Sequence, residues 1–421
     1  MSEQGPRLSW IGWCILGGLV AYSVAHYVYS AIYFALGTSG GDFRSAFPGP
    51  LLFRLVETWP SLAKDWIRPW FFTEKLSWNY GPVLHFLTAP LVFAESSHQA
   101  MTILLLVNHA LIAVTFCLWV RLLFGQRPGL AATLGLACLW LNYFPLLEAL
   151  TGREIEIFEL FLITASIWCL RTNRQGFAGI AIGLAAMTKF LPVILVPYLF
   201  IKGFRKAGWI ACGLMLVIAG IAQMLLGFEH SLTFRVFTAE AQAEYVATGY
   251  SNQSLMNLLH KTFTRFDMHV IKPETLYPRP LWILGTLVQT AVLAACGWFL
   301  LRWRRSRFVE TEVALLLLVM ILVPPHSNTY YLVFALPALS IGLAAWISRP
   351  QAISFLPKLA WGAAIALSGF LVPVKCFEPI TGLPGVVIAR IWQLYSLPAF
   401  GAIFAALAIV DVHQALRRDV I

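Results

Sequence analysis

The sequence predicts an all-α, polytopic transmembrane protein. Of its 421 residues, 59% are hydrophobic and only 12% are charged, and the mean hydropathy is +0.74. A water-soluble domain cannot bury that much apolar surface, so the chain requires a bilayer as its solvent. A spanning helix needs about 20 apolar residues, and several apolar runs are shorter, so we expect roughly 11–13 membrane segments that include re-entrant or short helices. We expect residues 1–421 to form a single integral membrane domain.

The first apolar run extends from Trp10 to about Ala35 and shows no signal-peptide cleavage pattern. It is also too long for a signal-peptide core, so we interpret it as a retained first helix. Six of the seven cysteines lie inside apolar runs, without the paired spacing of a disulfide framework or a metal site. The cysteines therefore read as small core residues.

Basic side chains gather in the short connectors between apolar runs, where cytoplasmic loops carry an excess of Lys and Arg. Placing these connectors in the cytoplasm puts both chain termini there as well. It also leaves residues 37–81 as a first outer loop and residues 229–280 as a long outer loop. The clusters are Arg121 and Arg127, Arg171 and Arg174, Lys202, Arg205 and Lys206, Arg302, Arg304, Arg305 and Arg307, Arg349 and Lys358, and Arg417 and Arg418.

The apolar runs between these anchors define the expected spans. The run 177–201 begins and ends at cytoplasmic clusters and is too short for two full spans, so we expect two half-helices that meet near Lys189-Phe190-Leu191-Pro192. The other segments are expected at 10–35, 82–94, 99–120, 129–147, 155–170, 207–228, 281–301, 311–323, 328–348, 358–374 and 387–412.

This threading places the polar chemistry on the outer face. Ionisable residues collect in residues 37–81, 148–156 and 229–280 and at His326 and Glu378, whereas the inner side receives short basic connectors. A pump or channel would place ionisable residues along a path through the membrane. The arrangement instead favours an enzyme that works at the outer leaflet.

Asp42 is the first candidate catalytic residue. It follows Gly40-Gly41 where the first helix opens into the outer loop, so its carboxylate could reach into a cavity. A helix cap or a solvated turn is the alternative for such an aspartate.

The segment LEALTGREIEIFEL carries Glu148, Arg153, Glu154, Glu156 and Glu159 at the start of a span. Glu156 and Glu159 are three residues apart and share one helix face. Charged side chains at a membrane boundary are costly unless they are hydrated, form ion pairs or take part in function. One interpretation is a solvated helix start capped by Thr151, and the other is that Arg153 or a nearby glutamate lines a sugar or phosphate pocket.

Lys189 lies within an apolar stretch, where a buried ammonium needs an anionic partner. A lipid phosphate or a core glutamate could be that partner, or the side chain could extend to an interface. His326 lies in a Pro-rich turn, where it either binds phosphate or holds the turn. Asn252, Gln253 and His260 belong to a polar stretch that leads into a short amphipathic helix, and their amides suit either sugar hydroxyls or helix capping.

Several familiar motifs are absent from the sequence, including an Asp-x-Asp pair, a Gly-rich phosphate loop, His-Glu-x-x-His and Gly-x-Ser-x-Gly. A sugar donor linked to a lipid phosphate is compatible with the absence of these motifs. Its leaving group is already a weakly basic phosphate, so the reaction needs no general acid. One carboxylate for the acceptor proton and cations near the phosphate could then suffice.

Several segments together resemble glycosyltransferase family 87, the polyprenyl-phosphate-mannose-dependent α-mannosyltransferases of the GT-C superfamily. The segments are GDF at 41–43, NYGP at 79–82, AGIAIGLAAMTKFLPVILVPYLF at 178–200, NQSL at 252–255 and PPHSNTYYLVFALPAL at 324–339. The chain departs from the family pattern at Gly81-Pro82, where Pro-Pro is usual, and at Gly152-Arg153-Glu154, where Gly-Gln or Gly-Asn is frequent.

The resemblance implies a GT-C fold in a bacterial plasma membrane, Asp42 as the catalytic base, and an inverting single displacement on the outer face. It implies that Lys189 and His326, to which we add Arg153, lie near the donor phosphate. Sugar or acceptor binding is expected at Asn79, Tyr80, Glu154, Asn252, Gln253 and His260. The expected partners are a polyprenyl-phosphate sugar, a glycolipid or glycan acceptor and membrane lipids, with no nucleic acid, metal or other cofactor.

The predicted reaction is transfer of a hexose, with mannose favoured, from the polyprenyl phosphate to an outer-face acceptor. Three alternatives stay open. One is a GT-C relative with another lipid-phosphate sugar, such as a pentose, or a lipid A-type acceptor. Another is a transporter of lipid-linked glycans, and the third is a membrane scaffold without activity.

Overall fold

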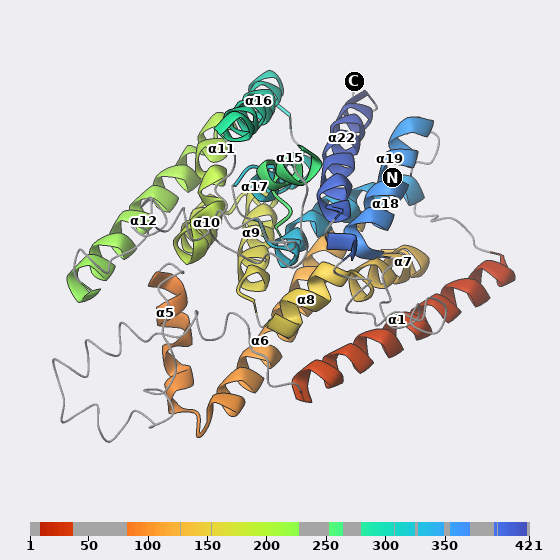
Figure 1. Ribbon diagram of the computed structural model, residues 1–421, viewed down its shortest axis with the longest axis horizontal. Coiled ribbons are helices and arrows are strands. Elements are labelled where there is room, and N and C mark those ends of the chain that lie inside the picture. The colour runs from red at the N-terminus through yellow and green to blue at the C-terminus, as the bar shows by residue number, and fades with distance from the viewer. Residues whose placement is uncertain are drawn as a thin grey trace. The chain divides into compact units, whose positions relative to one another are not determined.

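The computed structural model describes residues 9–36, 82–126, 128–152, 154–226, 252–263, 279–306, 308–324, 327–348, 354–370, 391–393 and 395–418. These residues form helices and turns, with no β-strand among them (Figure 1), which confirms the all-α prediction. Six of the described helices are long and apolar enough to cross a membrane, and a bent helix pair makes up to seven. The chain is therefore a multi-pass membrane protein.

The chain divides into two compact units, which we call unit 1 and unit 2. Unit 1 contains Met1–Ala31, Phe116–Glu148 and Ala243–Ile421, and unit 2 contains Ile32–Thr115 and Ala149–Gln242. Each unit is described by itself below. The single membrane domain expected from the sequence stays a prediction.

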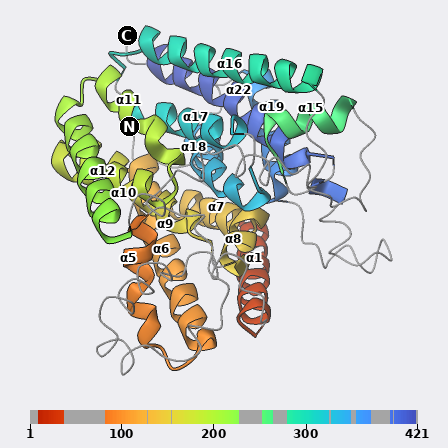
Figure 2. The same ribbon diagram turned by 60° about the vertical axis from the view of Figure 1, so that its left-hand side comes forward.

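Unit 2 is built around helix α10. Its described elements are α5 (Pro82–Thr88), a 3-10 turn (Ala89–Phe93), the start of α6 (Ser97–Phe124), α9 (Glu156–Arg171), α10 (Gln175–Lys189), a second 3-10 turn (Leu191–Ile194), α11 (Leu195–Ile201) and α12 (Arg205–Leu226). Helix α10 packs on α9, α12 and α5, and Figures 1 and 2 show it between α9 and α12. Val83, Met187 and Ile218 pack together in one of the buried apolar clusters of this unit.

Helices α10 and α12 approach each other through small residues. A Cβ atom on Gly179 would collide with the carbonyl oxygen of Ala207, and one on Gly183 would lie 3.2 Å from that of Ala211. Pairs of small residues four positions apart allow two membrane helices to bring their backbones close together. The sequence therefore fixes α10 tightly against α12.

The predicted break in the run 177–201 is confirmed. Helix α10 ends at Lys189, and Phe190 has φ 46° and ψ −26°, in the left-handed region that a bulky residue rarely adopts. Pro192 lies in the 3-10 turn that follows, before α11 begins at Leu195. The chain therefore has two shorter helices here, with Lys189 at the end of the first.

Unit 1 surrounds α17 (Val309–Leu322), all of whose residues are buried. The other described elements are α1 (Trp10–Leu36), α7 (Leu130–Leu141), α8 (Phe144–Gly152), α15 (Leu255–Phe263), α16 (Arg279–Arg302), a 3-10 segment (Thr329–Ala335), α18 (Leu336–Ser348), α19 (Phe355–Ile365), a π-helical turn (Ala366–Phe370) and α22 (Leu397–Arg418). Helix α17 packs on α22, α18 and α16, and α22 also packs on α19. Trp282, Leu287 and Trp298 of α16 stay exposed, as expected of side chains that face lipid.

The span predicted at 129–147 is not one straight helix, because the structure breaks it into α7 and α8, which meet at an angle of 59°. The Asn142 amide donates a hydrogen bond to the Cys138 carbonyl oxygen at 2.9 Å, and the Tyr143 hydroxyl donates one to the Leu332 carbonyl oxygen at 2.8 Å. These contacts hold a break that hydropathy does not reveal.

The span predicted at 387–412 is interrupted in its first part. Helix α22 begins at Leu397, and Ser396, with φ 54°, interrupts the chain before it. The left-handed conformation of Ser396 cannot continue a right-handed helix. The C-terminal span is therefore shifted toward the end of the chain.

Candidate active-site residues

The described residues include half of the residues that the sequence predicts for the site. Lys189 and Glu154 belong to unit 2, and Asn252, Gln253 and His260 belong to unit 1. The other predicted site residues, Asp42, Asn79, Tyr80, Arg153 and His326, lie outside the described residues. Their roles stay predictions.

Helices α9 and α10 form a hairpin, which we call the α9–α10 hairpin. The two helices pack together and have similar lengths, and the short turn between them contains Asn173 at φ 60°. Asparagine tolerates this left-handed conformation. Because the turn joins the other ends of the two helices, the first residue of α9, Glu156, and the last residue of α10, Lys189, come together at the open end.

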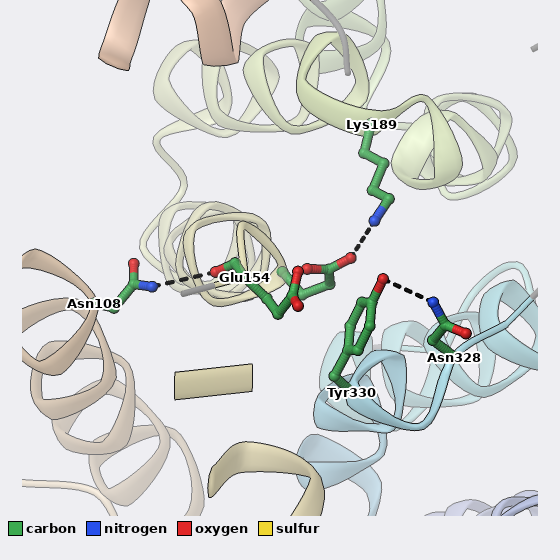
Figure 3. Close-up of polar contacts among 6 residues, drawn as sticks. Asn108, Glu154, Lys189, Asn328 and Tyr330 are labelled. Carbon is green, nitrogen blue, oxygen red and sulfur yellow. Dashed lines mark hydrogen bonds and ion pairs between the residues drawn. The ribbon is translucent and has the colours of Figure 1, made fainter. Parts of the chain in front are cut away.

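The Lys189 ammonium donates a hydrogen bond to Glu156 Oε1, and the two side chains form an ion pair (Figure 3). The Glu156 side chain is fully buried, whereas the Lys189 side chain keeps 13% of its surface exposed. The carboxylate lies in the first turn of α9 and the ammonium in the last turn of α10, which is where each helix dipole favours that charge. Of the partners considered from the sequence, the structure shows a core glutamate.

Glu159 lies one turn after Glu156 and is fully buried. None of the described residues forms a hydrogen bond with either of its carboxylate oxygens, although it interacts electrostatically with both Glu156 and Lys189. The alternative of a solvated helix start capped by Thr151 is therefore wrong. Helix α9 begins at Glu156, its N-cap position is Ile155, and both glutamates are removed from solvent.

Glu154 is held by both its backbone and its side-chain surroundings. The Asn108 amide donates a hydrogen bond to the Glu154 carbonyl oxygen at 3.2 Å (Figure 3), and the Glu154 N–H donates one to the Ala149 carbonyl oxygen at 2.8 Å. A Cβ atom on Gly152 would collide with the Glu154 carboxylate, so the glycine leaves room for this side chain. A direct role for Glu154 in sugar binding stays a prediction.

In unit 1, Asn252 and Gln253 are buried and bound to the backbone of other segments. Asn252 Oδ1 accepts hydrogen bonds from the Ser254 and Ser327 N–H groups, each at 3.0 Å. The Gln253 side-chain amide donates a hydrogen bond to the Gln393 carbonyl oxygen at 3.0 Å. The polar stretch therefore ties the start of α15 to two distant segments, and sugar binding by its amides stays a prediction.

The amphipathic helix expected after this stretch is confirmed as α15. Ser254 precedes its first residue, and the Ser254 hydroxyl accepts a hydrogen bond from the Asn257 N–H at 3.2 Å, as an N-cap does. His260 lies on the buried side of α15. Burial, followed by the neighbouring Lys261 charge, lowers the pKa of His260 from its usual value, which favours a neutral imidazole.

Lys261 is a partly buried cation that was not predicted from the sequence. Its ammonium donates hydrogen bonds to the Asn252 carbonyl oxygen at 3.1 Å, the Gln393 carbonyl oxygen at 3.0 Å and the Ser396 hydroxyl at 3.1 Å. Burial lowers the pKa of Lys261 to about 7. The available signal was its place on α15, four residues after Asn257 and thus on the same helix face. We call Lys261 and these three partners the Lys261 cluster.

The segment after His326 is also polar. The Asn328 amide donates a hydrogen bond to the Tyr330 hydroxyl at 2.9 Å (Figure 3), and the Tyr330 and Tyr331 rings meet edge to face with centroids 4.8 Å apart. Among the described residues, no group of three His, Cys, Asp or Glu side chains could hold a metal ion. The expectation that the protein needs no metal stays a prediction.

Comparison with known proteins gives a family and several similar solved structures. The sequence profile of glycosyltransferase family 87 matches residues 78–325, which is more than half of the chain. This range contains Lys189 and the Asn252-Gln253 pair, whereas Asp42 precedes it. A search of curated proteins gives no match.

Two of the similar structures are of ArnT from Cupriavidus metallidurans. One, bound to undecaprenyl phosphate, is 16% identical with a TM-score of 0.45, and the match covers 96% of this chain and 79% of that chain. The other, in the apo state, is 17% identical with a TM-score of 0.41, and the match covers 97% of this chain and 78% of that chain.

Proposed function

Because the chain belongs to glycosyltransferase family 87, we propose that it transfers a hexose, mannose, from a polyprenyl phosphate to an acceptor on the outer face of a bacterial plasma membrane. The observation that carries this proposal is the family match over residues 78–325. It includes the α9–α10 hairpin, which places Lys189 beside buried carboxylates. An ammonium in such a place is a suitable group to meet a phosphate.

In the proposed reaction, the acceptor oxygen attacks the anomeric carbon in a single inverting displacement. The bond between that carbon and the phosphate oxygen breaks, and its electron pair goes to the phosphate. Asp42 takes the proton from the acceptor hydroxyl. Lys189, Arg153 and His326 stabilise the phosphate, and no metal is required, since positioned cations can balance the charge that develops on a leaving group.

The sugar and the acceptor would contact a second group of residues in this proposal. The residues proposed to bind the sugar or the acceptor come from two parts of the chain. The first part supplies Asn79, Tyr80 and Glu154, and the second supplies Asn252, Gln253 and His260. Asn252 and Gln253 also organise the start of α15, because their amides bind the backbone near Ser327 and Gln393. Substitution of either amide is therefore expected to affect both folding and substrate binding.

The direct test measures sugar transfer in membranes that contain equal amounts of wild type, Asp42→Asn or Asp65→Asn protein. The donor is a synthetic polyprenyl phosphate that carries tritium-labelled mannose, and the acceptors are the endogenous lipids and glycans. General-base catalysis contributes about 10²–10⁴ in rate, so Asp42→Asn should nearly abolish transfer. Asp65→Asn, in the same outer loop, should retain it.

The outcomes separate the parts of the proposal. Equal transfer by wild type and Asp42→Asn would remove Asp42 from the mechanism. No transfer from the mannose donor, together with transfer from a pentose donor, would replace mannose with another sugar and leave the donor class intact. No transfer from any polyprenyl-phosphate sugar would contradict the proposed function.

A further inference from the structure

The ion pair at the open end of the α9–α10 hairpin offers Lys189 a partner that a phosphate can replace. We infer that Glu156 is a positioning residue that competes with the donor phosphate for the Lys189 ammonium, an inference that rests on the proposed polyprenyl-phosphate donor. Glu156 holds the ammonium at the end of α10 and yields it to the phosphate.

The geometry of the pair favours movement of the lysine. Glu156 is fully buried in the first turn of α9, whereas Lys189 keeps 13% of its side chain exposed. Lysine carries a compact charge on a flexible four-carbon chain. The ammonium, and not the carboxylate, is therefore the member of the pair that a ligand can reach and that can turn toward it.

The surrounding charges determine whether a phosphate joins the Lys189–Glu156 ion pair or displaces Glu156 from it. Lys189 interacts with both Glu156 and Glu159, which also repel each other. A phosphate that joined the intact pair would bring a second anion to the one ammonium of the pair in a buried place, and like charges held together in an interface are strongly unfavourable. The phosphate therefore has to displace Glu156 from the ammonium.

The chemistry of transfer supplies a reason for the exchange. The donor phosphate is a diester with one negative charge, and the released polyprenyl phosphate is a monoester that acquires a second. The second charge develops as the bond between the anomeric carbon and the phosphate oxygen breaks, while the acceptor proton goes to Asp42. A cation that moves toward the phosphate during this step stabilises the transition state more than the ground state.

The backbone at Lys189 also departs from ordinary helix termination. Phe190, the next residue, holds φ 46°, whereas the turn at the other end of the hairpin uses Asn173 for the same region of φ. Non-glycine residues in this conformation cluster at ligand clamps and other functional sites, where the surroundings fix them. Because α10 stops at Lys189, its ammonium projects from the last turn of a firmly packed helix.

The test measures the affinity of undecaprenyl phosphate for the purified protein in detergent. We expect Glu156→Gln to bind about tenfold more tightly than wild type, equivalent to about 1.4 kcal/mol, and Lys189→Met to bind at least about tenfold more weakly. In the Lys189→Met background, Glu156→Gln should lose its gain. Glu310→Gln, which alters a buried glutamate in the first turn of α17, is the matched control and should bind like wild type.

Two results overturn the inference while the proposed donor stands. One is binding by wild type with no gain from Glu156→Gln. The other is equally tight binding of phosphatidic acid by wild type, which would make the site a general one for anionic lipids. Failure of wild type to bind undecaprenyl phosphate would overturn both this inference and the proposed donor class.

A second measurement covers the case in which Glu156→Gln folds poorly, since it leaves a buried cation without its carboxylate. Glu156→Asp keeps the charge but shortens its reach by one methylene, so we expect a smaller gain in affinity. Undecaprenyl phosphate should also raise the melting temperature of Glu156→Asp more than that of wild type, because tighter binding to the folded state stabilises it more. Equal rises for the two proteins would overturn the inference, because a purely structural ion pair predicts them.

Discussion

The two units each hold a partly buried lysine, and the partners of the two lysines differ. In unit 2, Lys189 pairs with the Glu156 carboxylate and has Glu159 nearby. In unit 1, Lys261 donates hydrogen bonds to two backbone carbonyl oxygens and one hydroxyl, which come from separate segments. A carboxylate balances the ammonium charge and can be exchanged for another anion. Neutral oxygens from several segments instead use the ammonium as a crosslink.

A residue with positive φ accompanies each lysine. Phe190 follows Lys189 directly, and Ser396 supplies the hydroxyl that Lys261 binds. The two lysines thus share a strained neighbouring backbone but differ in their partners. We infer from the partners that Lys189 binds an exchangeable anion, whereas Lys261 joins separate segments of unit 1. We expect substitutions at Lys189 to change the reaction, and substitutions in the Lys261 cluster to change stability.

The largest expected effect is that of Lys189→Met on sugar transfer. Removal of a positioned charge stabiliser costs about 10²–10³ in rate, by analogy with oxyanion-hole donors. The rate of transfer from the polyprenyl-phosphate donor, at equal protein amounts, measures the effect. Lys206→Met, which removes an exposed lysine in the first turn of α12, is the control and should retain the rate. A Lys189→Met protein within a few-fold of wild type would remove the contrast between the two lysines.

Lys261→Met is expected to lower stability with little effect on donor affinity. The substitution removes the three hydrogen bonds of the ammonium, and a hydrogen bond contributes about 0.5–1.5 kcal/mol to stability. The Asn252 and Gln393 carbonyl oxygens keep the side-chain amides of Asn257 and Gln253 as donors. Thermal unfolding in detergent measures the loss of stability, and undecaprenyl phosphate binding measures the affinity. A variant of normal stability that lost affinity would instead place Lys261 in the binding site.

A smaller effect is expected from pH. Burial lowers the pKa of Lys261 from 10.5 to about 7 in the folded protein. Between these values the unfolded chain binds the proton and the folded protein releases it, so stability rises with pH across this window. The penalty is complete below pH 7 and vanishes above pH 10.5. The melting temperature of wild type should therefore rise relative to that of Lys261→Met between pH 7 and pH 9, and a flat difference would contradict the assignment.

The smallest expected effect is that of Ser396→Ala. It removes one of the three acceptors of the Lys261 ammonium and leaves the two carbonyl oxygens in place. The loss of one hydrogen bond corresponds to about 0.5–1.5 kcal/mol. A modest fall in melting temperature should follow, with normal sugar transfer. A fall as large as that of Lys261→Met would show that the hydroxyl dominates the cluster.

Much of the helical framework could be predicted from hydropathy and basic clusters. Hydropathy identifies the segments that lie in lipid, and the basic clusters identify the connectors between them. The predicted span 207–228 corresponds to α12 at Arg205–Leu226, and 281–301 corresponds to α16 at Arg279–Arg302. The bend between α7 and α8 could not be predicted in this way. It involves the Tyr143 hydroxyl and the Leu332 carbonyl oxygen, which are far apart in the sequence.

The sequence predicted which type of partner Lys189 needs, but not which residue supplies it. The sequence reasoning identified Lys189 as an ammonium that needs an anion, but several glutamates were available. The lengths of α9 and α10 and the short turn between them could have identified Glu156, because the first and last residues of such a hairpin meet. The Lys261 cluster was harder to foresee, since Gln393 and Ser396 lie over 100 residues beyond Lys261 and no sequence pattern joins them.

The close approach of α10 to α12 has a consequence for how the sequence can vary among relatives. There is no room for a Cβ atom at Gly179 against Ala207, and little at Gly183 against Ala211. An amino-acid substitution at one position of a pair is therefore constrained by the residue at the other. Related chains should therefore keep small residues at all four positions or change them in matched pairs. A lineage that enlarged one of them alone would displace the helix that carries Lys189, and its loss of transfer activity would originate more than one helical turn from that residue.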